Sequence, residues 1–152
     1  MPINVTAAFN KFQKDLVNLD PERTKNARVS RDWLLSKING FTGFFPLYTE
    51  KHIYFGSFAR RTKIRPLDDI DIMIALMAVG CTYSEDLSGN ITINVPDDCD
   101  AYKAYRHTYG NTLNSIKVVN EFVRKLSSVD QYRSSDIKRN QEAAVLNLKS
   151  YD

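Results

Sequence analysis

A chain of 152 residues with 43% hydrophobic and 26% charged residues is expected to form one water-soluble domain with a real core. Its net charge of +3 suits a polyanionic small molecule, but the basic residues are spread along the chain and make no strong case for nucleic-acid binding. No run approaches the roughly 18 apolar residues of a membrane helix, and no charged-then-apolar leader is present. We therefore expect a cytoplasmic protein with no membrane contact, in which Cys81 and Cys99 are reduced thiols rather than a zinc site or a disulfide.

Two helices are predicted at the start of the chain. Residues 5–19 place apolar side chains at helical intervals (Val5, Phe9, Phe12, Leu16 and Leu19), which predicts an amphipathic helix. Asp20-Pro21-Glu22 is typical of a helix start, and a second helix is expected to end near Asn39-Gly40. Its basic residues Arg23, Lys25, Arg28 and Arg31 are interpreted as a solvated face. The loop at 41–46 carries three Phe residues that we expect to pack on these two helices.

The most informative stretch runs from residue 56 to residue 76. A short strand at about 53–56 is followed by Gly56-Ser57, where a glycine would let the backbone approach a phosphate and Ser57 would add a hydroxyl and an N–H at a possible helix start. A second strand is predicted over 70–77. Asp69 and Asp71 should lie on one face of that strand, about 6–7 Å apart, where their mutual repulsion favours a bridging divalent cation. Together the two halves predict a site for phosphoryl transfer.

The second half of the chain alternates further strand and helix signals. A hairpin is predicted over 82–95, a turn and helix start over 96–101, and a long amphipathic helix over 112–126. Residues 127–140 are polar and are interpreted as a surface loop, and residues 141–149 are interpreted as a closing strand. Three aromatic side chains precede the long helix, and for these we favour packing over base stacking (Tyr102, Tyr105 and Tyr109).

The central stretch resembles the signature of the DNA polymerase β-like nucleotidyltransferase superfamily, in which Gly-Ser is followed after about ten residues by Asp-x-Asp between apolar residues. The finer pattern is similar to that of the cGAS/DncV-like nucleotidyltransferases, the SMODS-type enzymes of bacterial CBASS anti-phage defence that make cyclic di- and trinucleotide second messengers. The residues that carry this likeness are Gly56-Ser57-Phe58, Arg60, Thr62, Ile64, Arg65-Pro66 and Asp69-Ile70-Asp71. Neither Gly-Ser nor Asp-x-Asp is a specific signal alone, but the two motifs together at this spacing are a specific signal.

The resemblance implies an α+β fold: a polymerase β-like nucleotidyltransferase core over residues 1–152, with a mixed sheet flanked by two N-terminal helices and one long helix. It implies that Asp69 and Asp71 are catalytic and bind Mg²⁺ (or Mn²⁺), and that Gly56 and Ser57 hold the phosphates of a nucleoside triphosphate such as ATP. The family uses a third carboxylate, expected beyond Asp152, and a C-terminal helical lobe that is absent here. A regulatory protein partner from a defence operon would also fit the family.

Three interpretations follow. The chain is expected to be the N-terminal part of a larger enzyme, inactive when isolated and prone to self-association. One alternative is a catalytically incomplete nucleotidyltransferase fold that binds a nucleotide or a protein partner without turnover. The other is a minimal nucleotidyltransferase of the toxin–antitoxin kind, although the two leading helices and the long hairpin argue against it.

Overall fold

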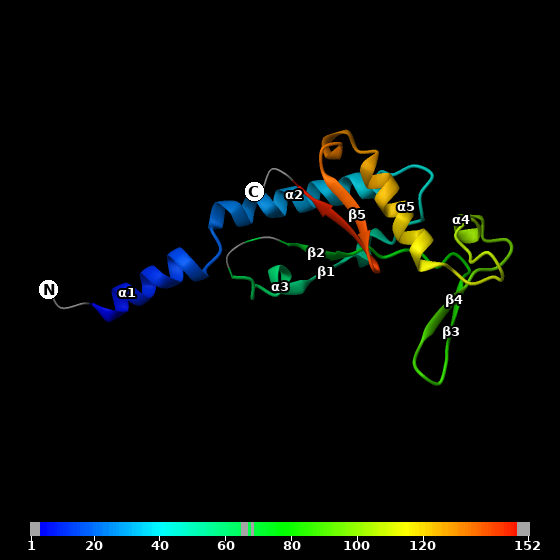
Figure 1. Ribbon diagram of the computed structural model, residues 1–152, viewed down its shortest axis with the longest axis horizontal. Coiled ribbons are helices and arrows are strands. Elements are labelled where there is room, and N and C mark those ends of the chain that lie inside the picture. The colour runs from blue at the N-terminus through cyan, green and yellow to red at the C-terminus, as the bar shows by residue number, and fades with distance from the viewer. Residues whose placement is uncertain (1–3, 65–66, 68, 149–152) are drawn as a thin grey trace. The chain divides into compact units, whose positions relative to one another are not determined.

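A computed structural model describes residues 4–64, 67 and 69–148 (Figure 1). The chain divides into two compact units, each assembled from two stretches of sequence. The first unit contains the residues up to 37 together with 49–75, and the second contains 38–48 together with the residues from 76 onward. The Gly-Ser turn and both aspartates of the sequence motif therefore belong to the first unit.

The first unit begins with the two predicted helices. Helix α1 (Val5–Phe12) starts after Asn4, whose side chain accepts a hydrogen bond from the Ala7 N–H, and continues as a π-helical segment, Gln13–Val17. Helix α2 (Pro21–Asn39) starts where predicted, because the Asp20 carboxylate accepts a hydrogen bond from the Arg23 N–H at 2.9 Å. The prediction of two helices is confirmed, with the first ending two residues earlier than expected.

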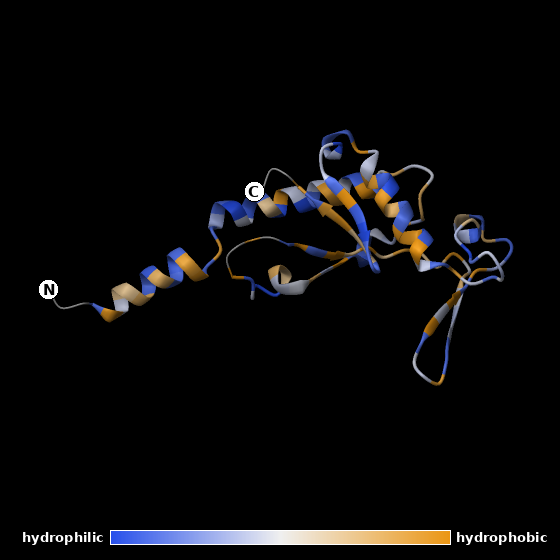
Figure 2. Ribbon diagram, in the orientation of Figure 1, coloured by the Kyte–Doolittle hydropathy of each residue, from blue (hydrophilic) through white to orange (hydrophobic). Residues whose placement is uncertain are grey.

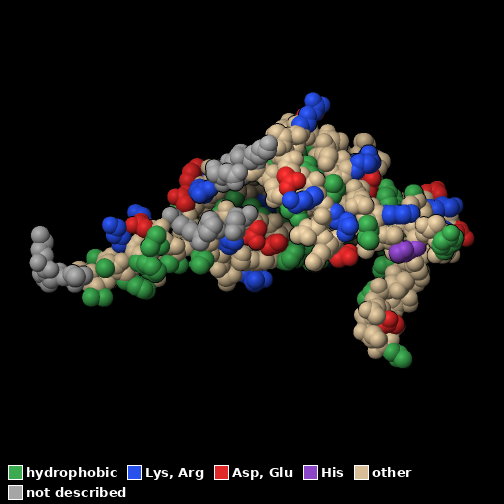
Figure 3. Space-filling model, in the orientation of Figure 1, with side chains coloured by type: hydrophobic (Ala, Val, Ile, Leu, Met, Phe, Trp, Pro, Cys, Tyr) green, Lys and Arg blue, Asp and Glu red, His purple; other side chains and the backbone are tan. Residues whose placement is uncertain are grey.

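The apolar stripe of the first helix is not part of a core. Its side chains remain exposed, with Val5 at 76%, Phe9 at 56%, Phe12 at 50% and Leu16 at 64% of full exposure. Hydrophobic side chains are accordingly visible on the surface along α1 (Figure 3). The periodicity identified the helix correctly, but the apolar face that it predicts is exposed instead of lying in the expected core.

A pair of short strands completes the first unit. Strand β1 (Ile53–Phe55), preceded by the 3₁₀ turn Thr49–Lys51, pairs antiparallel with β2 (Asp71–Met73), and the short helix α3 (Gly56–Ala59) follows β1 directly. The predicted strand over 70–77 is too long, since β2 has only three residues. Leu76 instead makes an isolated antiparallel bridge with Leu47 inside the second unit.

The second unit contains the predicted hairpin and two helices. Strands β3 (Thr82–Glu85) and β4 (Ile91–Asn94) pair antiparallel as expected, and helix α4 (Asp100–Lys103) follows. Helix α5 (Ser115–Ser127) begins three residues later than predicted. Its cap is Asn114, whose side chain accepts from the Lys117 N–H, whereas Thr112 is engaged in a bridge with Asn94.

The polar segment after α5 is more ordered than the sequence suggested. It forms a 3₁₀ turn, Asp130–Tyr132, and strand β5 (Asp136–Asn140), which pairs antiparallel with β6 (Ala143–Asn147). The surface-loop interpretation of 127–140 is therefore wrong, while the closing strand is confirmed. Strand β5 reads Asp-Ile-Lys-Arg-Asn and its side chains are mostly exposed, so it lacks the apolar alternation that reveals a strand.

The core of the second unit combines an aromatic ring of the loop after α2 with side chains from later in the chain. Phe45, Val95, Cys99 and Tyr102 are its buried members. Phe45 stacks on Tyr102 with 5.5 Å between ring centroids, and Phe44 lies edge-on to Phe122 of α5 at 4.7 Å. The three Phe residues thus pack on one another and on aromatic rings of the second unit. Their packing on the two N-terminal helices stays a prediction. The apolar stripe of α5, seen as orange beside blue in Figure 2, faces this cluster.

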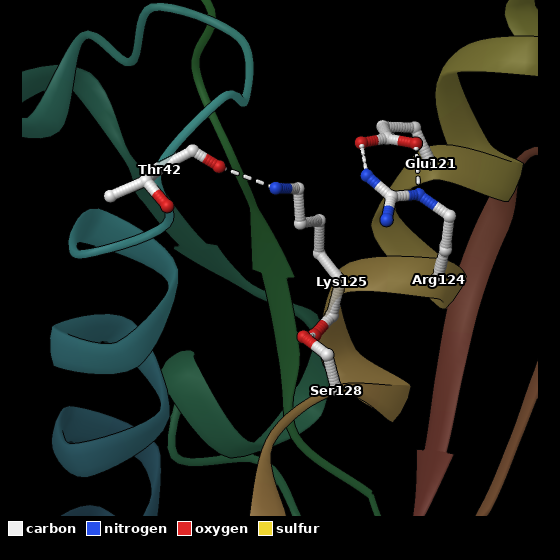
Figure 4. A network of polar contacts seen from close by, with 5 residues as sticks. All are labelled: Thr42, Glu121, Arg124, Lys125 and Ser128. Carbon is white, nitrogen blue, oxygen red and sulfur yellow. Dashed lines mark hydrogen bonds and ion pairs between the residues drawn. The ribbon is translucent and has the colours of Figure 1, made fainter.

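Polar contacts from α5 hold the same loop (Figure 4). The Lys125 ammonium donates to the backbone carbonyl of Thr42, and Ser128 Oγ donates to the Lys125 carbonyl at 2.7 Å. One turn earlier, Arg124 binds the buried Glu121 carboxylate, and this hydrogen bond lowers the pKa of Glu121. Of these contacts, the one between Lys125 and Thr42 ties α5 to the loop that carries Phe44 and Phe45.

The fold class is α+β, as predicted. Among the described residues the strands form three separate two-stranded antiparallel ladders, β1–β2, β3–β4 and β5–β6. The expected single mixed sheet is therefore not present in this part of the chain. None of the described helices combines the length and the apolar character needed to cross a membrane.

Candidate active site

The register of β1 and β2 brings the two halves of the sequence motif together. Phe55, the last residue of β1, is the partner of Asp71, the first residue of β2. Gly56 follows Phe55 directly, so the Gly-Ser turn begins beside the Asp71 side chain. Gly56 and Asp71, which are fifteen positions apart in the sequence, thus become neighbours, as a shared site for phosphate and metal would require.

Gly56 is required by its conformation and by its neighbour. Its φ of +72° lies in the left-handed region that L side chains rarely adopt. A Cβ atom at this position would lie 1.9 Å from Oδ2 of Asp71, so any side chain would displace the carboxylate. The backbone of Gly56 and the carboxylate oxygen of Asp71 are therefore in close contact, with no space for a methyl group at Gly56.

The residues after Gly56 form a tight turn around the Ser57 carbonyl. This oxygen accepts hydrogen bonds from the backbone N–H groups of Thr62 at 3.0 Å and Lys63 at 3.1 Å. The Gly56 carbonyl in turn accepts from the Arg60 N–H at 3.3 Å, and the buried ring of Phe58 anchors the turn. The Ser57 backbone is consequently fixed, and its hydroxyl is presented from a rigid turn.

Asp69 lies outside the strand that holds Asp71. It precedes β2 by two residues, and its side chain is 58% exposed. Its Oδ1 atom pairs with Nζ of Lys63 at 2.7 Å, and the Lys63 side chain is only 15% exposed. The expectation that both aspartates share one face of a strand is therefore wrong for Asp69, because regular pairing with β1 begins at Asp71.

A hollow of about 380 Å³ adjoins the turn in the first unit. It is lined by residues 17–19 before α2, by two residues of α2 and by the segment after Gly56-Ser57. Its charged lining is entirely basic and comprises Arg28, Arg61 and Lys63. Arg28, expected on a solvated face, thus also borders this hollow. A basic hollow beside a glycine turn is an environment that favours phosphate.

Two neighbouring side chains of the first unit were missed by sequence reasoning. The guanidinium of Arg31, expected to be solvated, lies 4.1 Å from the ring centroid of Tyr54 in β1. His52 Nδ1 accepts a hydrogen bond from the Ala75 N–H at 3.1 Å, and burial lowers the pKa of His52. Both contacts brace the β1–β2 pair, and neither has a local sequence signature.

The donor set fits a hard divalent cation in part. Carboxylate oxygens are the ligands that Mg²⁺ prefers. Asp71 lies against Gly56 of the Gly-Ser turn, whereas the contact of Asp69 is with Lys63. Within the described ranges, no group of three His, Cys, Asp or Glu side chains comes together. Asp68, interpreted as a turn residue, and Asp152 lie outside the described residues, as does the region expected to carry the third carboxylate.

The fold and this arrangement define an α+β protein in which a Gly-Ser turn lies against the Asp71 carboxylate of the neighbouring strand. No family model matches the sequence. The chain is, however, 45% identical over 151 residues to a protein of Bacillus cereus (strain VD146) named "Probable cyclic nucleotide synthase". The match covers 96% of this chain and 45% of that protein, so the chain spans less than half the length of its relative. At the level of sequence, the chain is similar to part of a protein that is named as a probable cyclic nucleotide synthase.

Proposed function

We propose that this chain is the nucleotide-transferring part of a cyclic oligonucleotide synthase of the cGAS/DncV-like, SMODS type. The enzyme would join ribonucleoside triphosphates into a cyclic di- or trinucleotide with release of pyrophosphate. The observation that carries the proposal is the contact between the Gly56 backbone and the Asp71 carboxylate, because it unites both halves of the motif. The 45% identity to a probable cyclic nucleotide synthase supports the same class of reaction.

The roles of the residues follow from their positions. Gly56 would allow a phosphate to approach the backbone, and the Ser57 hydroxyl would donate a hydrogen bond to a β- or γ-phosphate oxygen. Asp69 and Asp71 would hold Mg²⁺ or Mn²⁺, which when bound neutralises triphosphate charge and assists displacement at phosphorus. A third carboxylate from outside the described residues would complete the ligand set.

The setting of the enzyme is part of the proposal. A CBASS-type role in anti-phage defence, with ATP among the substrates and a regulatory protein partner, would fit a synthase of this kind. The competing proposal is a protein that binds nucleotide or a partner without turnover. Within the described part of the chain no group of three His, Cys, Asp or Glu side chains comes together, and this favours that alternative for the isolated 152 residues.

Turnover by the full-length protein tests the proposal. The protein is incubated with the four ribonucleoside triphosphates and Mg²⁺ or Mn²⁺, and pyrophosphate and cyclic products are measured. We expect release by the wild type and a loss of at least about a hundredfold in Asp69→Asn/Asp71→Asn, since both metal-binding charges are removed.

The matched control is Asp98→Asn/Glu142→Gln, which removes two exposed carboxylates distant in sequence from the motif. This control should retain wild-type turnover. Absence of pyrophosphate release by the wild type, or equal release by both double variants, would refute the proposed activity.

A further inference from the structure

We propose that Cys81 and Cys99 form a redox site in the second unit, at which a small-molecule disulfide converts the two thiols reversibly into an intramolecular disulfide. The sequence contains only these two cysteines, and both are free thiols in the structure. They are eighteen positions apart in the chain, and the fold brings their side chains into contact. Neither residue has a part in the proposed function, so this inference does not depend on it.

The first support is the distance between the two sulfur atoms. Sγ of Cys81 lies 3.9 Å from Sγ of Cys99, within hydrogen-bonding contact for sulfur. A disulfide bond is about 2.05 Å long, so the two atoms have to approach by about 1.9 Å to form one. That displacement is on the scale of a side-chain rotation. The fold therefore places the thiols one small movement away from a covalent bond.

The second support is that Cys99 is held in place and shielded from solvent. Its backbone N–H donates to the Pro96 carbonyl at 3.1 Å, and its own carbonyl accepts from the Lys103 N–H at 3.0 Å. Its side chain is only 4% exposed and belongs to the buried core of the second unit. A dissolved disulfide cannot reach this sulfur, whereas the sulfur of Cys81 is already in contact with it. Cys99 is therefore suited to react second, as the thiol that closes the bond.

The third support is that Cys81 is accessible from outside the core. Its side chain is partly exposed and packs at the margin of the cluster that contains Cys99. Burial, followed by the hydrogen bond with Cys99, raises the pKa of Cys81, so few Cys81 thiols are ionised at neutral pH. The first step is consequently slow at neutral pH and faster in mild alkali. Cys81 is the thiol that a dissolved disulfide meets first.

The chemistry consists of two successive thiol–disulfide exchanges, written here with glutathione disulfide. The Cys81 thiolate first attacks one sulfur of glutathione disulfide, which gives a mixed disulfide and releases one glutathione thiolate. The Cys99 thiolate then attacks the Cys81 sulfur and releases the second glutathione thiolate. Each cysteine gives up its proton, and each departing glutathione takes one up. The protein is thereby oxidised by two electrons, and glutathione disulfide is reduced to two molecules of glutathione.

The new bond would close a covalent loop around the β3–β4 hairpin. Strand β3 begins at Thr82, directly after Cys81, and β4 ends at Asn94, before Cys99. Helix α4 starts at Asp100, so the bond ties the base of the hairpin to the start of this helix. Because folding already holds the two sulfurs together, the bond should form more readily in the folded protein than in the unfolded chain.

Peptide mapping of the full-length protein tests the proposal. The native protein is incubated with glutathione disulfide at about pH 8.5, near the ordinary pKa of a thiol. Free thiols are then blocked by alkylation, and the protein is cleaved after glutamate. Glu85 is the only glutamate between the two cysteines, so a pair of linked peptides reports the bond. We expect the linked pair in the wild type and its release by dithiothreitol.

The single variants test the order of the two steps. In Cys99→Ala, Cys81 should retain one glutathione as a mixed disulfide, because no second thiol can displace it. In Cys81→Ser, Cys99 should stay unmodified, because the core shields it. Near-ultraviolet circular dichroism verifies that both variants are folded, and the wild-type measurement requires no substitution in the core.

A comparison with the unfolded chain tests the role of the fold. At one fixed ratio of glutathione to glutathione disulfide, the native wild type should form the bond at least about tenfold more favourably than the protein in concentrated urea. Equal formation in both states would overturn the proposal. So would a native wild type that accumulates glutathione on Cys81 without forming the bond, or a folded Cys81→Ser variant in which Cys99 reacts as readily as Cys81 does in Cys99→Ala.

Discussion

Gly56 and Asp71 are in such close contact that a Cβ atom at Gly56 would lie 1.9 Å from Oδ2 of Asp71. The contact arises because the partner of Asp71 in the β1–β2 pair is Phe55, the residue before Gly56. The register of the strand pair thereby places a turn suited to phosphate directly beside a carboxylate suited to a metal ion.

Substitution of Gly56 by Ala should damage both stability and ligand binding. The left-handed φ of +72° costs a non-glycine residue about 1–2 kcal/mol, and the methyl group also displaces the Asp71 carboxylate. We expect the free energy of unfolding to fall by at least this amount in urea titrations, and metal-dependent nucleotide binding to be lost.

Gly89 of the β3–β4 hairpin provides the control for that experiment. Its φ of +80° is similar, but the nearest atom to an added Cβ is 3.9 Å away. Gly89→Ala should therefore show the backbone cost alone and retain nucleotide binding. Equal loss of binding in both variants would mean that the Gly56–Asp71 contact is not what matters.

His52 should make stability depend on pH in the mildly acidic range. Its Nδ1 accepts from the Ala75 N–H, which only the unprotonated ring nitrogen can do, and burial lowers the pKa of His52. The unfolded state binds a proton near the ordinary pKa of about 6.5, whereas the folded state binds it at lower pH. Stability is therefore complete above about pH 6.5 and declines as the pH falls through the folded-state pKa.

The measurement is the urea midpoint between pH 7.5 and 5.5. His52→Asn, whose side-chain oxygen can accept the same hydrogen bond, should show a smaller decline over this range than the wild type. An unchanged slope in His52→Asn would exclude His52 as the origin of the pH dependence.

Phe45 should be the most costly side chain to truncate in the second unit. It is 3% exposed, and its ring contacts those of Tyr102, Tyr105 and Phe122. Phe45→Ala should reduce the free energy of unfolding by about 3–5 kcal/mol, as measured by near-ultraviolet circular dichroism. Tyr109→Ala removes a ring that is 93% exposed and should cost less than about 0.5 kcal/mol. Similar costs for both would contradict the aromatic core.

The exposed stripe of α1 should cause the isolated 152-residue chain to self-associate. Phe9 and Phe12 are at least half exposed on the same helix, and burial of such surface against a second copy is favourable. Phe9→Ser/Phe12→Ser should lower the mean mass in sedimentation-velocity experiments at micromolar concentration. The exposed Ile91 of β4 gives the comparison, and Ile91→Ser should not change the mass. A wild-type chain that sediments as a monomer throughout would refute this expectation.

The elements with strong local signals were predictable from the sequence. Helix α2 was identified because Asp20-Pro21 marks its start. The β3–β4 hairpin was identified because apolar and polar residues alternate from Asn90 to Val95, directly after a turn that contains Gly89. Strand β5 was missed because its polar side chains carry no alternation, and because the two-residue turn that joins it to β6 contains no glycine or proline, with Gln141 at a positive φ of 52°. The sequence did not predict Phe122 and Tyr102 as partners of the Phe41–Phe45 loop, because aromatic rings indicate burial but not direction.

The candidate site was predictable only in its composition. Spacing identified Gly56, Ser57, Asp69 and Asp71, and the structure brings Gly56 against Asp71. The alternation of side chains along a strand predicted that Asp69 lies on the same strand face as Asp71. Strand β2 begins only at Asp71, and the Asp69 carboxylate pairs with Lys63. Outside the candidate site, Tyr109 was expected to pack but is exposed, whereas Tyr102 is buried as expected.

The most direct test of the central claim is calorimetric titration of the full-length protein with a non-hydrolysable ATP analogue. If the Gly56–Ser57 turn and Asp71 form one metal-dependent phosphate site, the wild type binds with Mg²⁺ and not with a chelator. Asp71→Asn and Ser57→Ala should each weaken binding by about tenfold or more, about 1.4 kcal/mol, while Asp98→Asn leaves it unchanged. Binding that persists without metal, or that is unaffected by Asp71→Asn, would contradict the account.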